Sequence, residues 1–474
     1  MKTLLRVALA VVPLLAPAAV RAAPWPAEAR FRELYRELVE TNTAQSAGSC
    51  TLAAERMAAR LKAAGVADDD LHPIVVPEFP RDGGLVVVYP GRDPDAKAIL
   101  LLAHLDVVEA RREDWQRDPF TLVEEDGMFF ARGASDDKAQ AAIWVDTLVR
   151  FRDEHYRPRR TVKLALTCGE ESGGRLNGAR WLTENRRALI DAAFALNEGG
   201  MGELDAQGRR VAVEVEAGEK ASQNFRLEVT NRGGHSSRPV ADNAIYHLAG
   251  ALERLAAYEF PAQLNDANRG YFAAMAKIQA ARGEPELAAA MDALLREPPD
   301  AAAVALVSAR DPGWHAMLRT TCVATMLEAG HAQNALPQRA RANVNCRIFP
   351  GVPPEAIRRE LEALIADPAV TVATLQARGP SAPSPPLTRA ILAPVERLAA
   401  TFWPGVPVVP VLQPYATDAV YLNAAGIPTY GIAPIFVGPD LGNIHGLDEH
   451  VGVQALLEGR EFLYRLVKIY ADRP

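Results

Sequence analysis

The sequence predicts an α/β protein with two parts: a main domain on a doubly wound, mostly parallel sheet, and an inserted ferredoxin-like (βαββαβ) lid or dimerisation domain. Apolar runs alternate with helical patterns in the first half of the chain and again near its end, while the middle follows a βαββαβ order. The length of 474 residues also exceeds the chain length that a single hydrophobic core normally supports. We expect residues 23–217 and 378–474 in the main domain and residues 218–377 in the insertion.

Residues 1–22 are predicted to form a secretory signal peptide. Lys2 and Arg6 precede an apolar stretch over residues 7–20, and Ala22 supplies the small side chain that a signal peptidase reads. The alternative is a membrane anchor, but the stretch is shorter than the ~20 residues that a spanning helix needs. We therefore expect a periplasmic or secreted protein without a stable membrane anchor. The net charge of −7 is modest for this length, which argues against a nucleic-acid partner.

The elements of the main domain follow from two patterns. Short runs that are apolar throughout are typical of parallel strands covered on both faces. Segments with apolar residues at helical spacing separate these runs, and ligands gather beyond the carboxyl ends of such strands. The predicted strands cover residues 97–104, 162–168, 191–196, 408–412 and 428–432, and the predicted helices cover residues 137–151, 175–190 and 452–470.

The insertion is predicted from alternating strands and amphipathic helices. An Ala-rich helical stretch over residues 263–314 enlarges it, and a Pro-rich junction at residues 379–386 returns the chain to the main domain. The predicted strands of the insertion cover residues 223–230, 322–328, 341–349 and 370–376, and its predicted helices cover residues 242–258 and 353–366.

A set of acidic and imidazole side chains follows the predicted strands or precedes predicted helices. Each has an ordinary explanation when taken singly, such as a helix cap or a solvated pair. Together they place several carboxylates at one edge of the sheet, which is tolerable only with a compensating cation. Two imidazoles and several carboxylates, without a thiolate, suit zinc, cobalt or manganese in a site with open positions. The set comprises His104, Asp106, Asp136, Glu170, Glu171, Glu198 and His445.

Short motifs between about residue 30 and residue 470 resemble, in order and at compatible spacings, the di-zinc metallopeptidase family. Its members include aminoacylase, glutamate carboxypeptidase, acetylornithine deacetylase, succinyl-diaminopimelate desuccinylase and Gly-X carboxypeptidase. The motifs are LLAHLDVV, ARGASDDK, TCGEESGG, LNEGG, GGHSSRP, QNALP followed by VNCRIFPG, ATDAVYLNAAGIPTYG and NIHGLDEHV.

The resemblance implies a site for two zinc ions, with cobalt or manganese as alternatives. His104 would bind one ion and His445 the other. Asp136 would bridge both ions, Glu198 would complete the His104 site, and Glu171 would complete the His445 site.

The resemblance also implies roles for two acids beside the ligands. Asp106 matches the position that orients the ligand imidazole through its second nitrogen. Glu170 matches the general base, which accepts a proton from the attacking water and passes it to the departing amine. The alternative assignment makes Glu170 the ligand and Glu171 a structural residue.

Three residues of the insertion match family positions that bind substrate. The resemblance implies that His235 stabilises the developing oxyanion, often from the neighbouring subunit of a homodimer. Asn334 and Arg347 would hold the substrate, with Arg347 suited to a carboxylate. The alternatives are a turn-forming role for Asn334 and an ion pair with an acid of the insertion for Arg347.

The function implied by the resemblance is metal-dependent hydrolysis of an amide bond in an N-acyl amino acid or short peptide, as in carboxypeptidases and deacylases. Glu rather than Asp at position 198 favours this reading, because in the family it accompanies substrates with a free carboxylate. One alternative is a dipeptidase or aminopeptidase on the same metal site. Another is a non-catalytic, metal-stabilised binding protein, since fold resemblance does not prove turnover.

The four cysteines lack the spacing of a disulfide framework or a structural zinc site. We expect Cys50 and Cys168 to be packing residues. Cys322 and Cys346 lie in two predicted strands that could pair antiparallel, so a cross-strand disulfide is an alternative to packing for this pair.

Overall fold

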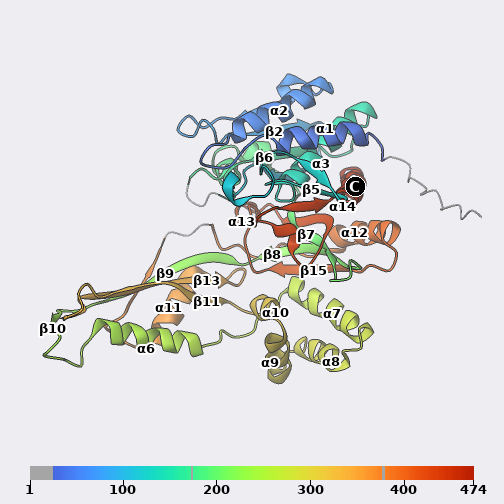
Figure 1. The fold of residues 1–474 in the computed structure, drawn as a ribbon. Helices are drawn as coiled ribbons and strands as arrows, with labels where there is room; N and C mark the ends of the chain where they lie inside the picture. The colour runs from blue at the N-terminus through green and yellow to red at the C-terminus, as the bar shows by residue number, and fades with distance from the viewer. Residues whose placement is uncertain (1–24, 172–174, 376–378, 474) are drawn as a thin grey trace, which may run out of the picture.

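A computed structural model describes residues 25–171, 175–375 and 379–473 (Figure 1). The predicted signal peptide lies outside these residues. Within the described ranges, no helix is long and apolar enough to cross a membrane. The boundaries proposed for the two domains stay predictions, and the elements are described below as the structure arranges them.

The main sheet has eight strands, and its centre is parallel. The neighbouring strands β6, β3, β7 and β16 all run parallel, whereas the outer pairs β1–β2 and β2–β6 and the pair β16–β8 are antiparallel. The predicted mostly parallel α/β sheet is therefore confirmed, as part of a mixed sheet. In spatial order the strands are β1 (Leu71–Ile74), β2 (Gly84–Tyr89), β6 (Val162–Thr167), β3 (Ile99–His104), β7 (Phe194–Leu204), β16 (Thr429–Val437), β8 (Arg210–Glu219) and β15 (Val408–Gln413).

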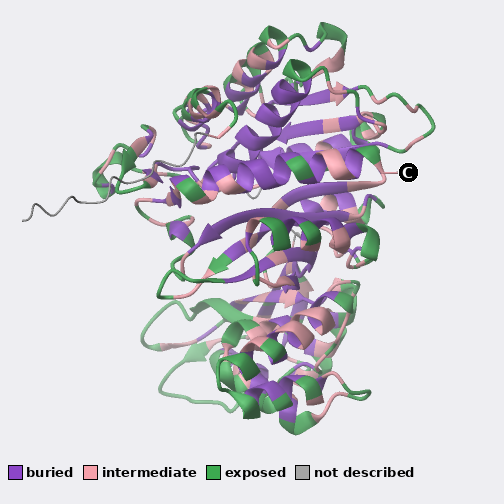
Figure 2. Ribbon diagram, turned by 90° about the vertical axis from the view of Figure 1, so that its right-hand side faces the viewer, coloured by how far each residue is buried: buried purple, intermediate pink, exposed green. Residues whose placement is uncertain are grey.

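Helices cover both faces of the main sheet, and the central strands are buried between them (Figure 2). Strand β3 shows why its sequence is apolar throughout: Leu101 packs into the core of one face, and Leu100 and Leu102 pack into the core of the other. The first face is covered by α1 (Glu28–Val39), α2 (Cys50–Ala63), α3 (Lys138–Asp153), α12 (Arg389–Phe402) and α14 (Val453–Asp472). The second is covered by α4 (Gly178–Asn185), α5 (Arg187–Ile190) and α13 (Ala419–Ala424).

The insertion contains a separate four-stranded antiparallel sheet with its own hydrophobic core. Its elements follow the predicted βαββαβ order, and Figure 1 shows the sheet extending away from the main one. In chain order they are β9 (Ala221–Thr230), α6 (Ala244–Ala257), β11 (Thr321–Ala329), β13 (Arg339–Ile348), α11 (Pro354–Ile365) and β14 (Thr371–Thr374). In space the strand order is β11-β13-β9-β14, so β11 is an edge strand.

The Ala-rich stretch forms four helices, the first of which packs on the main sheet, although the sequence had suggested that the stretch enlarges the lid. Its apolar residues Phe272 and Met291 belong to the core cluster of the main sheet. Gly270 allows close approach to the edge strand β15, since a Cβ atom there would lie 2.4 Å from Pro410 Cγ. Covering an edge strand in this way protects its unpaired backbone groups. The helices are α7 (Asp266–Ala281), α8 (Pro285–Leu294), α9 (Ala301–Arg310) and α10 (Pro312–Met317).

Several elements differ from their predicted bounds. The single helix expected over residues 175–190 is divided into α4 and α5 at Arg186, whose backbone is not helical. Strand β7 runs on to Leu204 rather than ending at Leu196. The segment after β9 forms a short separate strand, β10 (Gly234–His235), which pairs with β12 (Ala335–Leu336).

Two disulfides join the four cysteines. Cys322 and Cys346 are direct partners across β11 and β13, which confirms the cross-strand disulfide considered above. Cys50 and Cys168 also form a disulfide, with Cα atoms 6.0 Å apart, so the expectation that they only pack was wrong. The two residues lie 118 positions apart, and sequence spacing alone could not show that α2 and the end of β6 meet.

Candidate metal centre

The metal centre lies where the parallel strands β3 and β6 end beside β7, which continues past this point. Strand β3 lies between β6 and β7, with His104 in register with Thr167 of β6 and Leu101 in register with Leu196 of β7. His104 is the last residue of β3, Glu170 and Glu171 come shortly after β6, and Glu198 follows Leu196 within β7. The carboxyl ends of parallel strands thus bring these side chains to one edge of the sheet.

The candidate ligands form two groups joined by Asp136. His104 Nε2 lies 3.0 Å from Asp136 Oδ1 and 3.6 Å from Glu198 Oε2. His445 Nε2 lies 2.7 Å from Glu171 Oε1 and 3.1 Å from Asp136 Oδ2. Each oxygen of Asp136 therefore faces a different imidazole, which is the arrangement of a carboxylate that bridges two cations. The Asp136–Asp137 peptide bond is cis.

The charges of this cluster are strongly coupled. Burial alone would lower the pKa of His104, but Glu198, Asp106 and Asp136 raise it well above its usual value. Hydrogen bonds to Asp136 and Glu171 raise the pKa of His445 to about 10. Burial raises the pKa of Glu198 to about 7. The carboxylates thus create a field that favours positive charge in their midst.

The donor set fits two divalent cations. His104, Asp136 and Glu171 offer ligand atoms within 4.8 Å of one another, as do His104, Asp137 and Glu198. One imidazole and two or three carboxylates per group form a nitrogen and oxygen set of the kind that divalent transition metals accept. Asp137 Oδ2 is also buried without a hydrogen-bond partner, as expected for an oxygen next to an ion site.

Asp106 holds the loop that follows β6. Its carboxylate accepts hydrogen bonds from the backbone N–H groups of Gly169 at 2.8 Å, Glu170 at 3.3 Å and Glu171 at 3.0 Å. His104 Nδ1 lies 2.9 Å from the backbone carbonyl oxygen of Asp106 and 3.6 Å from its carboxylate. The imidazole is therefore oriented by the backbone of this residue, while the carboxylate fixes the position of the two glutamates.

Glu170 lies among acids. Burial, together with the negative charges of Glu198, Asp418 and Glu171, raises the pKa of Glu170 well above its usual value, against the opposing effect of His104. A carboxylate with a raised pKa holds a proton more readily, which suits a group that must accept one and then release it.

Glu449 is a residue of the site that the sequence did not single out. It is completely buried and accepts hydrogen bonds from the backbone N–H groups of Gly133, Ser135 and Asp136 at 2.8 to 3.0 Å. Arg132 neutralises it with a 2.7 Å contact. Glu449 thus fixes the Asp136 loop as Asp106 fixes the Glu170 loop. Its position four residues after His445, next to strand β17 (His450–Gly452), is the sequence feature that could have indicated this role.

Asp418, which the sequence left without a role, supports the same edge of the sheet. It is buried and accepts hydrogen bonds from Thr167 Oγ1 at 3.1 Å and from Asn177 Nδ2 at 2.6 Å. Burial raises its pKa to about 6. This contact ties the end of β6 to the start of α13.

The three candidate substrate residues of the lid are not brought together within one chain. Asn334 and His235 are neighbours, because the Asn334 carbonyl accepts a hydrogen bond from Ser236 at 3.0 Å. They lie at the far tip of the lid, by strand β10 (Figure 1). Arg347 pairs with Ser222 at the opposite end of the lid sheet. The eight residue steps from Ser222 to Thr230 alone span ~26 Å of strand.

Comparison with known proteins agrees with this architecture. A model of peptidase family M20/M25/M40 matches residues 100–469, more than half of the chain. Human N-fatty-acyl-amino acid synthase/hydrolase PM20D1 is 29% identical over 387 residues, covering 80% of this chain and 75% of the relative. Rattus norvegicus aminoacylase-1A is 25% identical over 397 residues, covering 82% and 84%.

A solved structure shares the whole fold. The M20 family metallo-carboxypeptidase Sso-CP2 from Sulfolobus solfataricus matches with a TM-score of 0.67 at 16% identity, over 93% of this chain and 99% of that one. The two-sheet architecture is therefore that of a known fold. Together with the family match, this shows that the chain belongs to peptidase family M20/M25/M40 and is an enzyme of the metallopeptidase and amidohydrolase type.

Proposed function

We propose that the protein is a zinc-dependent amidohydrolase that releases an amino acid from an N-acyl amino acid or a short peptide. The observation that carries this proposal is the pair of donor groups joined by Asp136, with Glu170 beside them. The relatives support the substrate class, since their names describe hydrolysis or deacylation of N-acyl amino acids. Family membership implies a dinuclear metal site, and the nitrogen and oxygen donor set suits zinc, with cobalt or manganese as alternatives.

In this proposal each residue has a defined part. His104, Asp136 and Glu198 hold one ion, and His445, Glu171 and the second oxygen of Asp136 hold the other. The ions, when bound, would polarise the amide carbonyl and acidify a water molecule.

Glu170 moves the proton. Its carboxylate accepts a proton from the attacking water and then passes it to the departing nitrogen, so that the amine leaves neutral and the acyl group becomes a carboxylic acid, which releases its remaining proton to solvent. The raised pKa of Glu170 supports this part, because a raised pKa favours the protonated form that must act as the acid.

A homodimer through the lid supplies the remaining substrate contacts. His235 and Asn334 lie far from Arg347 within one chain, so all three can meet one small substrate only if two chains contribute. The edge strand β11 supports this arrangement, because it exposes the apolar side chains Val323, Met326 and Leu327.

The two disulfides support a location outside the cytoplasm. Disulfides persist in oxidising compartments such as the periplasm or the extracellular space. We place the mature protein there, in agreement with the predicted signal peptide.

The test is release of free amino acid from a panel of N-acetyl amino acids and unblocked dipeptides, with metal-free protein before and after addition of zinc. Zinc-dependent release from the blocked substrates is the expected result. Activity confined to dipeptides with a free amine would move the assignment to a dipeptidase. Silence of the zinc-loaded protein across the panel would contradict hydrolysis and favour a binding protein.

A further inference from the structure

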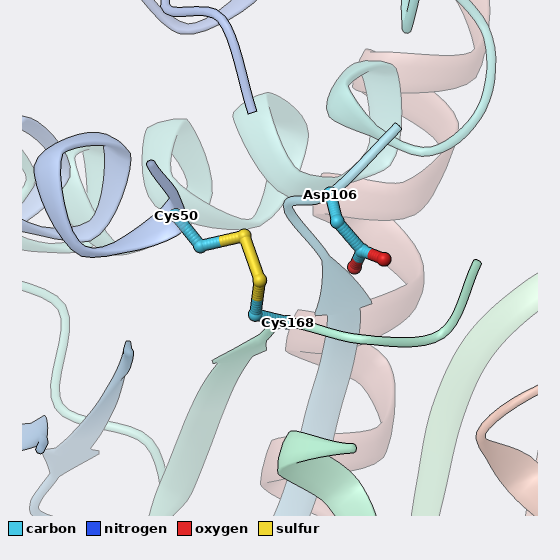
Figure 3. Close-up of side chains that lie close together, drawn as sticks. All are labelled: Cys50, Asp106 and Cys168. Atoms are coloured by element: carbon cyan, nitrogen blue, oxygen red, sulfur yellow. A yellow bond between two sulfur atoms is a disulfide. The ribbon is translucent and has the colours of Figure 1, made fainter. Parts of the chain in front are cut away.

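The Cys50–Cys168 disulfide lies directly against the metal centre. The two sulfur atoms and a carboxylate oxygen of Asp106 lie within 4.8 Å of one another, and all three residues are buried (Figure 3). Because the sulfurs are bonded to each other, they are not thiolate ligands. The cluster is therefore a structural cross-link beside the site, and its role depends on the two segments that it joins.

On one side, the disulfide ends in the loop that carries Glu170 and Glu171. Cys168 directly precedes Gly169, whose φ of +95° marks a sharp turn. A Cβ atom at Gly169 would lie 1.8 Å from the Leu176 carbonyl oxygen, so the turn packs tightly on the following segment. Two anchors hold this loop: the disulfide at Cys168, and Asp106, which accepts three of its N–H groups.

On the other side, Cys50 belongs to a segment fixed to the same edge of the sheet. It is the first residue of α2, where the Ser49 side chain caps the helix. Just before it, Thr43 Oγ1 donates to the Leu105 carbonyl at 2.6 Å, and Lys138 Nζ donates to the Thr41 carbonyl at 2.7 Å. Leu105 lies between His104 and Asp106, so the disulfide closes a short path from the end of β3 to the Glu170 loop.

We propose that Cys50 and Cys168 are positioning residues for hydrolysis: their disulfide fixes the Glu170–Glu171 loop relative to His104 and Asp136. This inference rests on the proposed function. It assigns the bond a part in catalysis beyond cross-linking, because a general base and a metal ligand act only when held within a fraction of an ångström of their working places.

The test compares two double variants of the full mature chain. C50A/C168A removes the bond beside the site, and C322A/C346A removes the bond inside the lid as a matched control. We expect kcat of C50A/C168A on an N-acetyl amino acid to fall roughly 10- to 100-fold, with a small change in KM and weaker retention of one of two zinc ions. C322A/C346A should keep the kcat and zinc content of the parent.

A second experiment tests the same proposal if C50A/C168A folds poorly. C322A/C346A is folded oxidised and then treated with a phosphine, which converts the remaining disulfide into two thiols and is itself oxidised to the phosphine oxide. Thiol counting confirms the cleavage, and the same fall in kcat is expected. Unchanged kcat and zinc content in either protein, with an active parent, would overturn the positioning role. An inactive parent would instead contradict the proposed function.

Discussion

Glu170 and Glu171 are adjacent in the chain but differ in their surroundings. Glu171 contacts His445 Nε2 at 2.7 Å, which supports its proposed role as a ligand. Glu170 has neighbouring carboxylates, which together with burial raise its pKa. These two successive side chains have different neighbours, so one sequence pair can serve one ion site and one proton-transfer site.

Replacing Glu170 by Gln tests this division. The amide keeps the volume of the side chain but cannot accept the proton, so kcat should fall by roughly 10²- to 10⁴-fold. Zinc content, measured by elemental analysis, should stay at the parental level because the ligands are intact. Near-normal turnover with full zinc content would contradict the proton-transfer role.

Glu214, on strand β8, makes the free energy of unfolding depend on pH, and it does so away from the metal centre. Burial and then the charge of Glu203 raise its pKa from 4.5 to about 7. Between these values the folded protein binds more protons than the unfolded chain, so the free energy of unfolding falls as pH rises. The loss reaches at most about 3 kcal/mol.

The Glu214→Gln variant should remove this dependence. Urea unfolding at pH 8 should show the variant to be more stable than the parent, whereas at pH 4 the two should agree. Equal differences at both pH values would show that Glu214 is not titrating in this range.

At the scale of elements, two remote acids hold the two loops of the metal centre. Asp106 accepts N–H groups of the loop after β6, and Glu449 accepts N–H groups of the loop before α3. Each acid therefore fixes a loop that carries a candidate ligand, as carboxylates behind a metal site commonly do.

The Glu449→Gln variant should weaken the affinity for zinc roughly 10- to 100-fold, measured by competition with a chelator. An amide lacks one acceptor oxygen and leaves Arg132 without its counter-charge. Glu458→Gln is the matched control, because Glu458 lies on α14 and also contacts an arginine, Arg210, at 2.7 Å. Equal zinc affinity in both variants would mean that Glu449 supports the fold alone.

At the scale of the molecule, the lid separates the three residues that are proposed to bind substrate. A two-fold dimer in which β11 strands face each other would bury the exposed apolar side chains of this edge and carry a lid tip toward the partner's metal centre. Activity would then depend on association, because neither chain alone holds a complete substrate site.

Leu327→Lys tests the dimer, since Leu327 is 65% exposed on β11. The charge should shift the mass measured by light scattering from dimer to monomer and should lower kcat at equal zinc content. Val75→Lys is the control, because Val75 is 64% exposed in the main part of the chain and should change neither quantity. A parent that is already monomeric and fully active would contradict the arrangement.

Much of the fold was predictable because its signals are local. An apolar run such as β3 is buried on both faces, and the side chain that follows it must lie at the edge of the sheet. The residues His104, Glu171 and Glu198 could be singled out because they lie at or near the ends of predicted strands, and the family resemblance supplied their roles as candidate ligands. The structure brings them together with Asp136 and His445.

Only the tertiary structure decided contacts between segments distant in the chain. Glu449 meets the N–H of Asp136 from 313 residues away, and Cys50 meets Cys168 from 118 residues away. Helix α7 packs on β15. The sequence could not show this contact, because an apolar helix face does not indicate which surface will cover it. The sequence by itself determined the type of those elements that have a clear periodicity and the chemistry at the strand ends, since periodicity and residue type act locally. The packing of the folded chain decided which remote groups hold that chemistry in place.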